Sequence, residues 1–352
     1  MKNYSLLLVY TLIALLPVKA QGLEEVRSFG KLQPVGVAMS KKGRLFVSFP
    51  KWTDNYAHAV VEVLPNGKLI PFPNPEWNKW DTAQPQDHFL SVQALFIDRS
   101  DAVWALDLAN PTGMKPIRAG VKLVKLTLDG TVERVYRFDD LPGAGLNDVQ
   151  VDARRQVAYL SDPGRSAVVV LDLKTGKSRT LLQGDASTKA DPNTVLSIDG
   201  KDVRDQAGRP FSSNVNGIAL SHDGEYFYFR PITKKRLYRI PTKFLYDPAY
   251  TAAQVSAAVE DLGEAGFSHG MIADAAGNVY MGDSQEQVIR RRTPAGKLET
   301  LVQDKRIHWP DSYAIGPDGY LYVTMAQLDR APRYHDGTDR VVYPYWLYRI
   351  KL

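Results

Sequence analysis

The chain has 352 residues, of which 44% are apolar, and it carries a formal net charge of +5 and no cysteine. An apolar fraction of this size excludes an intrinsically disordered chain, and the lack of cysteine excludes a fold held by disulfides. The 26 glycines and 22 prolines are spread along the chain, which is typical of many short strands joined by turns.

The first residues have the pattern of a secretory signal peptide. Lys2 opens a short polar region, an apolar run covers residues 6–16, and Ala20 ends the segment with a small residue. A run of about 11 residues is too short to cross a bilayer, which needs about 20. We therefore predict cleavage after Ala20, a secreted or periplasmic protein without a stable membrane anchor, and a single domain over residues 21–352.

Six segments of the remaining chain share one β-hairpin pattern. Each has an apolar run, a small or acidic residue, two or three turn residues, and a second apolar or aromatic run. The turns open at Ser40, Asp98, Asp152, Ser221, Asp274 and Gly316, at intervals of 58, 54, 69, 53 and 42 residues. Repeats at this spacing indicate a propeller or a solenoid.

Two more strands are expected after each hairpin, such as residues 287–292 and 297–301 after the fifth. Four antiparallel strands in each of six repeats predict an all-β, six-bladed β-propeller. Only residues 346–350 remain as a strand after the sixth hairpin, so we expect residues 23–29 to supply its outer strand and close the last blade. A short helix is expected at residues 252–259.

Polar residues come just before the first hairpin strand in five consecutive repeats. The first hairpin strand is the innermost of its blade, so these residues would surround one mouth of the central channel. They are Gln93, Asn147 (followed by Asp148), Asn216, His269 and Asp311. One such asparagine is often only a turn former, but the convergence favours a ligand or metal site.

Further residues are expected around the same mouth. Asp162 and Asp283 end second hairpin strands and would support the ligand site from behind. Trp309 comes directly before the sixth hairpin, and long connections carry other aromatic residues to this face. Aromatic walls around a few polar groups suit a planar or cyclic organic ligand, so we predict Gln93, Asn147, Asn216 and Trp309 as binding residues.

Other functional classes find little support. Residues 234–236 and 290–292 are basic clusters, but charge at strand edges also blocks unwanted strand pairing, and no nucleic-acid motif is present. The chain has no nucleophile elbow, P-loop or HExxH motif. We expect a monomer that binds a small organic molecule and no nucleic acid.

Four stretches resemble the bacterial, L-dopachrome tautomerase-related branch of the Yellow/major royal jelly protein family. They are LNDVQVD with AYLSDPG (146–164), VNGIALS with YFRPITKKRLYRIP (215–241), SHGMIADAAGNVYMGDSQE (268–286) and WPDSYAIGPDGYLYVT (309–324). The resemblance covers about residues 23–350 and implies a secreted six-bladed propeller. Insect members are linked to dopachrome conversion and some bind biogenic amines, so the resemblance implies a small organic ligand.

A more distant resemblance is to the gluconolactonase/regucalcin (SMP-30) group, which binds a divalent metal through a Glu, two Asn and an Asp. Asn147 and Asn216 match the two Asn positions, but the Glu position falls near Gln33 and the Asp position is His269. A divalent metal held by Asn147, Asn216, His269 and Asp311 is therefore one alternative, although hard cations such as calcium prefer carboxylates.

Three functions remain open from the sequence. The first is isomerisation of a small cyclic compound, with His269 as general base, Asp311 beside it, and Asn147 and Asn216 holding a developing oxyanion. The second is binding of an aromatic amine without turnover. The third is a metal-dependent lactonase.

Overall fold

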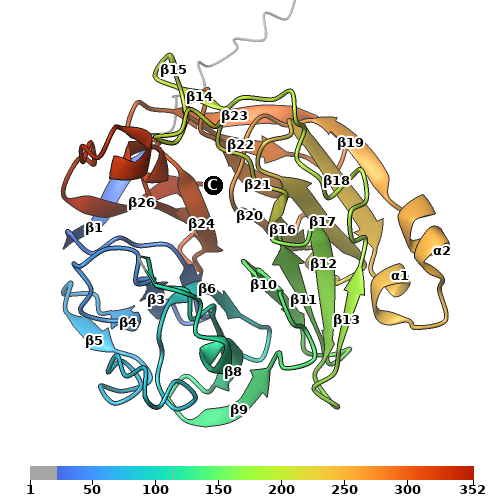
Figure 1. The fold of residues 1–352 in the computed structure, drawn as a ribbon, viewed down its shortest axis with the longest axis horizontal. Helices are drawn as coiled ribbons and strands as arrows, with labels where there is room; N and C mark the ends of the chain where they lie inside the picture. Colours follow the sequence, from blue (N-terminus) through green and yellow to red (C-terminus); the bar gives the residue numbers. More distant parts are fainter. Residues whose placement is uncertain (1–21, 113) are drawn as a thin grey trace, which may run out of the picture.

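The strands form six four-stranded antiparallel sheets arranged around one axis (Figure 1). The computed structural model describes residues 22–112 and 114–352. Its architecture confirms the predicted all-β, six-bladed propeller. The predicted signal peptide lies outside the described residues. Within the described residues, no helix has both the length and the apolar composition that a membrane crossing requires.

The first five blades each use four consecutive strands, ordered from the axis outward. Blades one to three consist of β2 (Val37–Met39), β3 (Leu45–Ser48), β4 (Val60–Val63) and β5 (Leu69–Pro71); β6 (Val92–Ile97), β7 (Val103–Asp107), β8 (Lys122–Leu126) and β9 (Val132–Arg137); and β10 (Val149–Asp152), β11 (Val157–Asp162), β12 (Ala167–Asp172) and β13 (Ser178–Leu181). Blades four and five consist of β16 (Val215–Leu220), β17 (Tyr226–Pro231), β18 (Arg236–Pro241) and β19 (Glu260–Glu264); and β20 (Met271–Ala273), β21 (Val279–Asp283), β22 (Val288–Arg292) and β23 (Leu298–Gln303).

Blade six joins the two ends of the described chain. It consists of β24 (Pro310–Ile315), β25 (Tyr320–Met325), β26 (Tyr345–Lys351) and β1 (Glu24–Gly30). β1 runs antiparallel to β26, and Arg349 Nε donates to Glu24 Oε2 at 2.9 Å where the two residues face each other. The predicted closure by the N-terminal strand is confirmed, and it leaves no unpaired edge inside the ring.

The longer connections carry the few remaining elements. Two short strands, β14 (Ser197–Ile198) and β15 (Lys201–Asp202), pair in the insert between blades three and four. The helical segments are α1 (Lys243–Tyr246), α2 (Ala252–Ala257), η1 (Arg118–Gly120), η2 (Leu328–Arg330) and η3 (Pro332–Tyr334). α2 begins at a capping box of Thr251 and Gln254, as a helix start requires. It ends two residues before the predicted position, because β19 begins at Glu260 and the chain must extend before it.

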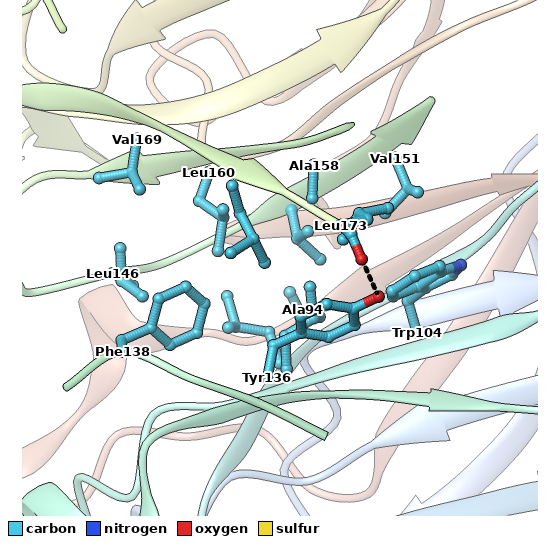
Figure 2. Close-up of a cluster of buried hydrophobic side chains, with 14 of the residues drawn as sticks. Ala94, Trp104, Tyr136, Phe138, Leu146, Val151, Ala158, Leu160, Val169 and Leu173 are labelled. Carbon is cyan, nitrogen blue, oxygen red and sulfur yellow. Dashed lines mark hydrogen bonds between the residues drawn. The ribbon is translucent and has the colours of Figure 1, made fainter. Parts of the chain in front are cut away.

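Much of the core lies between neighbouring blades. In the cluster between blades two and three, Trp104 and Tyr136 from blade two pack against Leu160 and Val169 from blade three (Figure 2). The Tyr136 hydroxyl donates to the Leu173 carbonyl at 3.1 Å, so the buried phenol keeps a polar partner. This packing explains the apolar runs of the hairpins, since both faces of a blade are covered.

Glycines bring the innermost strands unusually close together. Gly36, Gly217 and Gly270 occupy the same place in blades one, four and five, directly before or near the start of the innermost strand. A Cβ at these glycines would collide with the carbonyl oxygens of Gln93, His269 and Asp311, respectively, in the next blade. The close approach narrows the channel at the level of the predicted polar residues.

Candidate functional site

The structure brings the five predicted polar residues together at the start of the innermost strands. They line one small space with two further polar residues; we call this set the polar ring, and its members are Gln93, Asn147, Asp148, Asn216, His269, Asp311 and Ser312. The space measures about 10 Å³, which is room for about one water molecule. The ring is therefore a constriction that a single polar or charged group can fill.

A chain of amides connects three blades across the ring. Gln93 Nε2 donates to Asn147 Oδ1, and Asn147 Nδ2 donates to Asn216 Oδ1 at 2.9 Å. Both asparagine oxygens thus already accept a hydrogen bond from a neighbouring amide. The contacts fix the orientation of the amides, which keeps this side of the ring uncharged and rigid.

His269 is 2% exposed and is held from two sides. Its Nε2 lies 3.0 Å from Ser284 Oγ, and its ring stacks on Trp309 with the centroids 3.9 Å apart. Nδ1 has no hydrogen-bond partner among the described residues. Burial lowers the pKa of His269 to about 3, and the positive charge of Arg230 adds to the effect. The predicted role of general base requires a pKa near the working pH, but a desolvated imidazole beside a guanidinium stays neutral and is a poor proton acceptor.

Trp309 covers one face of the His269 imidazole. It is 2% exposed, and the ring of Phe211 meets it edge-on at 5.0 Å. Residues of the insert between blades three and four pack on it; we call residues 196–211 the cap, and its apolar members are Leu196, Ile198, Val203 and Phe211. Trp309 and the cap thus place buried aromatic surface beside His269, but Trp309 does not itself line the ring space.

Asp148 and Asp311 are the acids of the ring. Both keep some surface open to the ring space, yet the surrounding protein displaces most of their water. Burial raises the pKa of Asp148 to about 7. Burial also raises the pKa of Asp311 to about 8, and the charge of Asp148 raises it further. No basic side chain of the described residues stabilises either carboxylate, so both titrate near neutral pH.

With this geometry in view, comparison with known proteins decides the family. The profile described as "Major royal jelly protein" matches residues 90–352, more than half of the chain. The chain belongs to the major royal jelly protein family. Major royal jelly protein 5 of Apis mellifera is 22% identical over an alignment of 228 residues, and the match covers 61% of this chain and 36% of that protein. The match thus spans little more than a third of that relative's length.

Solved structures resemble this royal jelly family propeller over nearly its whole length. A gluconolactonase from Xanthomonas campestris has a TM-score of 0.57 at 11% identity and covers 94% of this chain and 90% of its own. Virginiamycin B lyase from Staphylococcus aureus has a TM-score of 0.54 at 14% identity, with 94% and 99% covered. Regucalcin, a calcium-binding protein from Agrobacterium tumefaciens, has a TM-score of 0.53 at 16% identity, with 93% of both chains covered. At these identities the likeness shows the fold alone.

The structure does not bring Asp162 and Asp283 into the polar ring of the royal jelly family propeller. Asp162 accepts from Arg165 Nε at 2.6 Å and from the Gly145 amide at 3.0 Å. Asp283 accepts from Arg290 Nη1 at 2.7 Å. Both acids are buried and neutralised, and they hold the connections that leave the second hairpin strands. An acid at a strand end has the same sequence pattern whether it binds a ligand or a loop, so the sequence could not separate the two.

Arg230 is a buried residue near His269 for which the sequence predicts no role. Its side chain is fully buried, and Nη2 donates to the carbonyl oxygens of Lys234, at 3.2 Å, and of Gly266. Burial lowers the pKa of Arg230 to about 10. The only sequence signal was an arginine within the apolar strand YFYFRP. Arg230 anchors the corner before His269, and its charge adds to the burial that lowers the pKa of that histidine.

The predicted metal ligands meet in the polar ring, and three of the four already contact other protein groups. Among the residues that the structure describes, no group of three or more His, Cys, Asp or Glu side chains could hold a metal ion. The Asn147 and Asn216 oxygens accept amide hydrogens, and His269 Nε2 faces a serine hydroxyl. Gln33, at the position of the lactonase glutamate, instead donates to the Ala326 carbonyl at 2.6 Å outside the ring.

Proposed function

We propose that the protein binds a small organic amine with a cyclic or aromatic body, and that the polar ring receives the ammonium group. The observation that carries this proposal is the pair Asp148 and Asp311, two desolvated carboxyls without a basic partner among the described residues. A charge buried without a partner is costly, so a bound cation would stabilise the ionised pair. The ring space is about the size of one such group.

The aromatic surroundings support the rest of the ligand. Trp309 stacks on His269, Phe211 packs edge-on against Trp309, and Tyr334 meets Phe211 edge-on at 6.2 Å. Aromatic side chains beside a few polar groups favour a planar organic body over an aliphatic chain. The membership in the royal jelly family agrees with this ligand class, since some insect members bind biogenic amines.

Calorimetric titration with tyramine tests the proposal. We expect saturable heat at one site in the wild type, and a loss of affinity of at least about 10-fold in Asp311→Asn, which removes an ion pair shielded from water. Asp139→Asn is the matched control, because Asp139 is an exposed acid far from the ring residues in the fold. Equal affinities in wild type and Asp311→Asn would contradict the proposal.

Binding should also depend on pH. The carboxyls must ionise to pair with an ammonium group, and their pKa values are raised to about 7 and about 8. We therefore expect tyramine affinity to rise from pH 6 to pH 8.5, where the amine itself remains protonated. An affinity that is constant across this range would show that neither acid contacts the ligand.

Isomerisation by proton transfer is a second candidate. A carboxyl whose pKa lies near the working pH can both release and accept a proton, as general acid–base catalysis requires. Under this proposal Asp311 and Asp148, in place of His269, would exchange the proton of a dopachrome-like substrate. Product formation by wild type with a drop of at least about 100-fold in Asp311→Asn would support it. Saturable binding without product would exclude isomerisation and support only the binding function.

The same titration separates these proposals from a metal-dependent hydrolase. Calcium, manganese and zinc are titrated in place of tyramine, after treatment with a chelator. Stoichiometric metal binding that is lost in Asp311→Asn, together with metal-restored hydrolysis of a lactone, would favour the gluconolactonase-like alternative. No metal-dependent heat or hydrolysis is expected if the ring receives an organic cation.

A further inference from the structure

A second cavity opens at the other end of the innermost strands. β10 shows the geometry most simply, because Asp148 at its start lines the polar ring while Val151 and Asp152 at its end line this cavity. The volume is about 390 Å³, within the range of small-molecule sites. We call it the turn-side funnel, because the first hairpin turns of the blades form its rim.

The wall of the funnel is apolar and comes from all around the propeller. Residues near the ends of the innermost strands line it. The half-buried ones among them are Met39, Ile97, Leu220, Ile272, Ala273 and Ile315. Half-buried aliphatic side chains facing one another across a mouth retain apolar surface that a ligand can cover. The wall can therefore hold an apolar body with no need for a specific polar contact.

The rim of the funnel carries basic groups. Lys41, Arg99 and Arg154 line it and are exposed, and they come from the turns of blades one, two and three. Lys41 Nζ donates to the Arg99 carbonyl at 2.6 Å, which keeps the two cations side by side. The Arg99 guanidinium is exposed and forms no ion pair in the described part of the chain, and Asp223 on the blade-four turn lies within reach of its charge. The guanidinium can therefore bind a ligand anion.

The acids of the rim are already occupied by the protein. Asp98 accepts from Trp104 Nε1 at 2.8 Å, Asp274 accepts from the Tyr280 hydroxyl at 2.8 Å, and Asp152 pairs with Arg155 at 2.6 Å. Asp101, the fourth acid that lines the funnel, accepts from the Lys41 backbone amide at 3.0 Å. These contacts hold the carboxylates on the turns. The lining therefore holds four carboxylates and three cations, of which Lys41 and Arg99 form no ion pair among the described residues. A ligand anion would bind to these two cations.

The pKa of His222 shows that the charges of Arg99 and Arg154 both reach the blade-four turn. His222 lies on the blade-four turn, and partial burial lowers its pKa. The positive charges of Arg99 and Arg154 lower this pKa further, whereas the negative charges of Asp223 and Asp274 oppose the change. The charge of Arg99 therefore reaches across the mouth from blade two to blade four. Arg154 already pairs with Asp152 Oδ1 at 3.7 Å, so an anion at the rim would bind chiefly to Arg99.

We propose that the turn-side funnel binds an amphipathic organic anion, with its apolar body against the strand ends and its carboxylate on Arg99. The site lies at the opposite end of the innermost strands from the polar ring, and its proposed ligand carries the opposite charge. It does not depend on the function proposed for the ring, and one molecule can hold both ligands.

Calorimetric titration with decanoate tests this site. We expect one saturable site in the wild type and a loss of at least about 10-fold in affinity in Arg99→Met, which keeps the apolar stem but removes the charge-assisted hydrogen bonds. Lys42→Met is the matched control, because Lys42 is an exposed cation in the neighbouring turn that does not line the funnel. Equal losses in the two variants would show unspecific charge attraction and overturn the proposal.

Two further measurements test whether the apolar wall of the funnel contacts the ligand. Ala275→Trp places a large side chain in the rim and should abolish decanoate binding, whereas Ala276→Trp, one residue further along the same turn and outside the lining, should leave it unchanged. Decylamine and inorganic sulfate should bind at least about 10-fold more weakly than decanoate to the wild type, because one has the wrong charge and the other no apolar body. Decylamine binding as tight as that of decanoate would overturn the proposal even if a variant failed to fold.

Discussion

At the residue scale, burial decides the chemistry of the polar ring. His269 and Asp311 come from neighbouring blades and were predicted as a base and its partner. The structure instead lowers the pKa of His269 to about 3 and raises that of Asp311 to about 8. Desolvation disfavours the charged form of each group, so it moves a base and an acid in opposite directions. The carboxyls, and not the imidazole, are therefore the groups that titrate near neutral pH.

The raised pKa of Asp311 predicts a pH-dependent stability. An aspartate titrates at about 3.9 in an unfolded chain and at about 8 here, so the folded state holds the proton more tightly and loses stability as the pH rises through this window. Asp311→Asn removes the ionisation. At pH 8.5 we expect this variant to be more stable than wild type by at least about 1 kcal/mol, measured by urea unfolding without ligand.

The difference in stability between wild type and Asp311→Asn at pH 5 is the internal control. Asp311 is mostly protonated there in the folded protein, so the advantage of the amide should shrink towards zero relative to pH 8.5. A difference between variant and wild type that is the same at both pH values would show that Asp311 ionises normally in the fold.

At the element scale, the start of each innermost strand sets the width of the channel. Gly270 leaves no room for a Cβ, because that atom would collide with the Asp311 carbonyl of the next blade. Gly36 and Gly217 make the same close approach in blades one and four. The hairpin pattern in the sequence predicted where these strands lie, but the reason for a glycine here is a contact with a different blade.

Gly270→Ala tests this close packing. The added methyl group must push blades five and six apart, so we expect a loss of about 1–3 kcal/mol in the free energy of unfolding, the usual cost of overpacking. Gly22→Ala is the control, since a Cβ there meets nothing within 4 Å. Denaturant unfolding of both variants measures the effect, and similar stabilities would mean that the blades can separate without cost.

At the scale of the whole molecule, closure of the ring depends on the first strand of the described chain. β1 pairs with β26 along its length, and Leu23 and Phe29 at its ends are 5% and 4% exposed. Blade six therefore joins sequence positions more than 300 residues apart, such as Glu24 and Arg349. Without β1 the last blade would expose an unpaired edge and its apolar face.

Deletion of residues 21–30 should abolish cooperative folding for this reason. We expect a broad thermal transition by circular dichroism, where the full chain and a chain lacking only residues 1–20 show one sharp transition. An unchanged, sharp transition in the 21–30 deletion would show that the other strands close the propeller by themselves.

The sequence alone determined the repeat, the number of blades, the closure by the first strand and the set of polar residues that meet at one mouth. These features follow from local patterns, because alternating apolar runs and turns specify hairpins, and identical places in a repeat meet around an axis. Only the tertiary structure decided that Asp162 and Asp283 hold loops, that burial lowers the pKa of His269 to about 3, and that it raises those of Asp148 and Asp311 to about 7 and about 8. It alone also showed that an apolar funnel with Arg99 on its rim opens at the other end. Desolvation and close approach between blades depend on atoms far apart in the sequence, and those distances exist only once all six blades have closed.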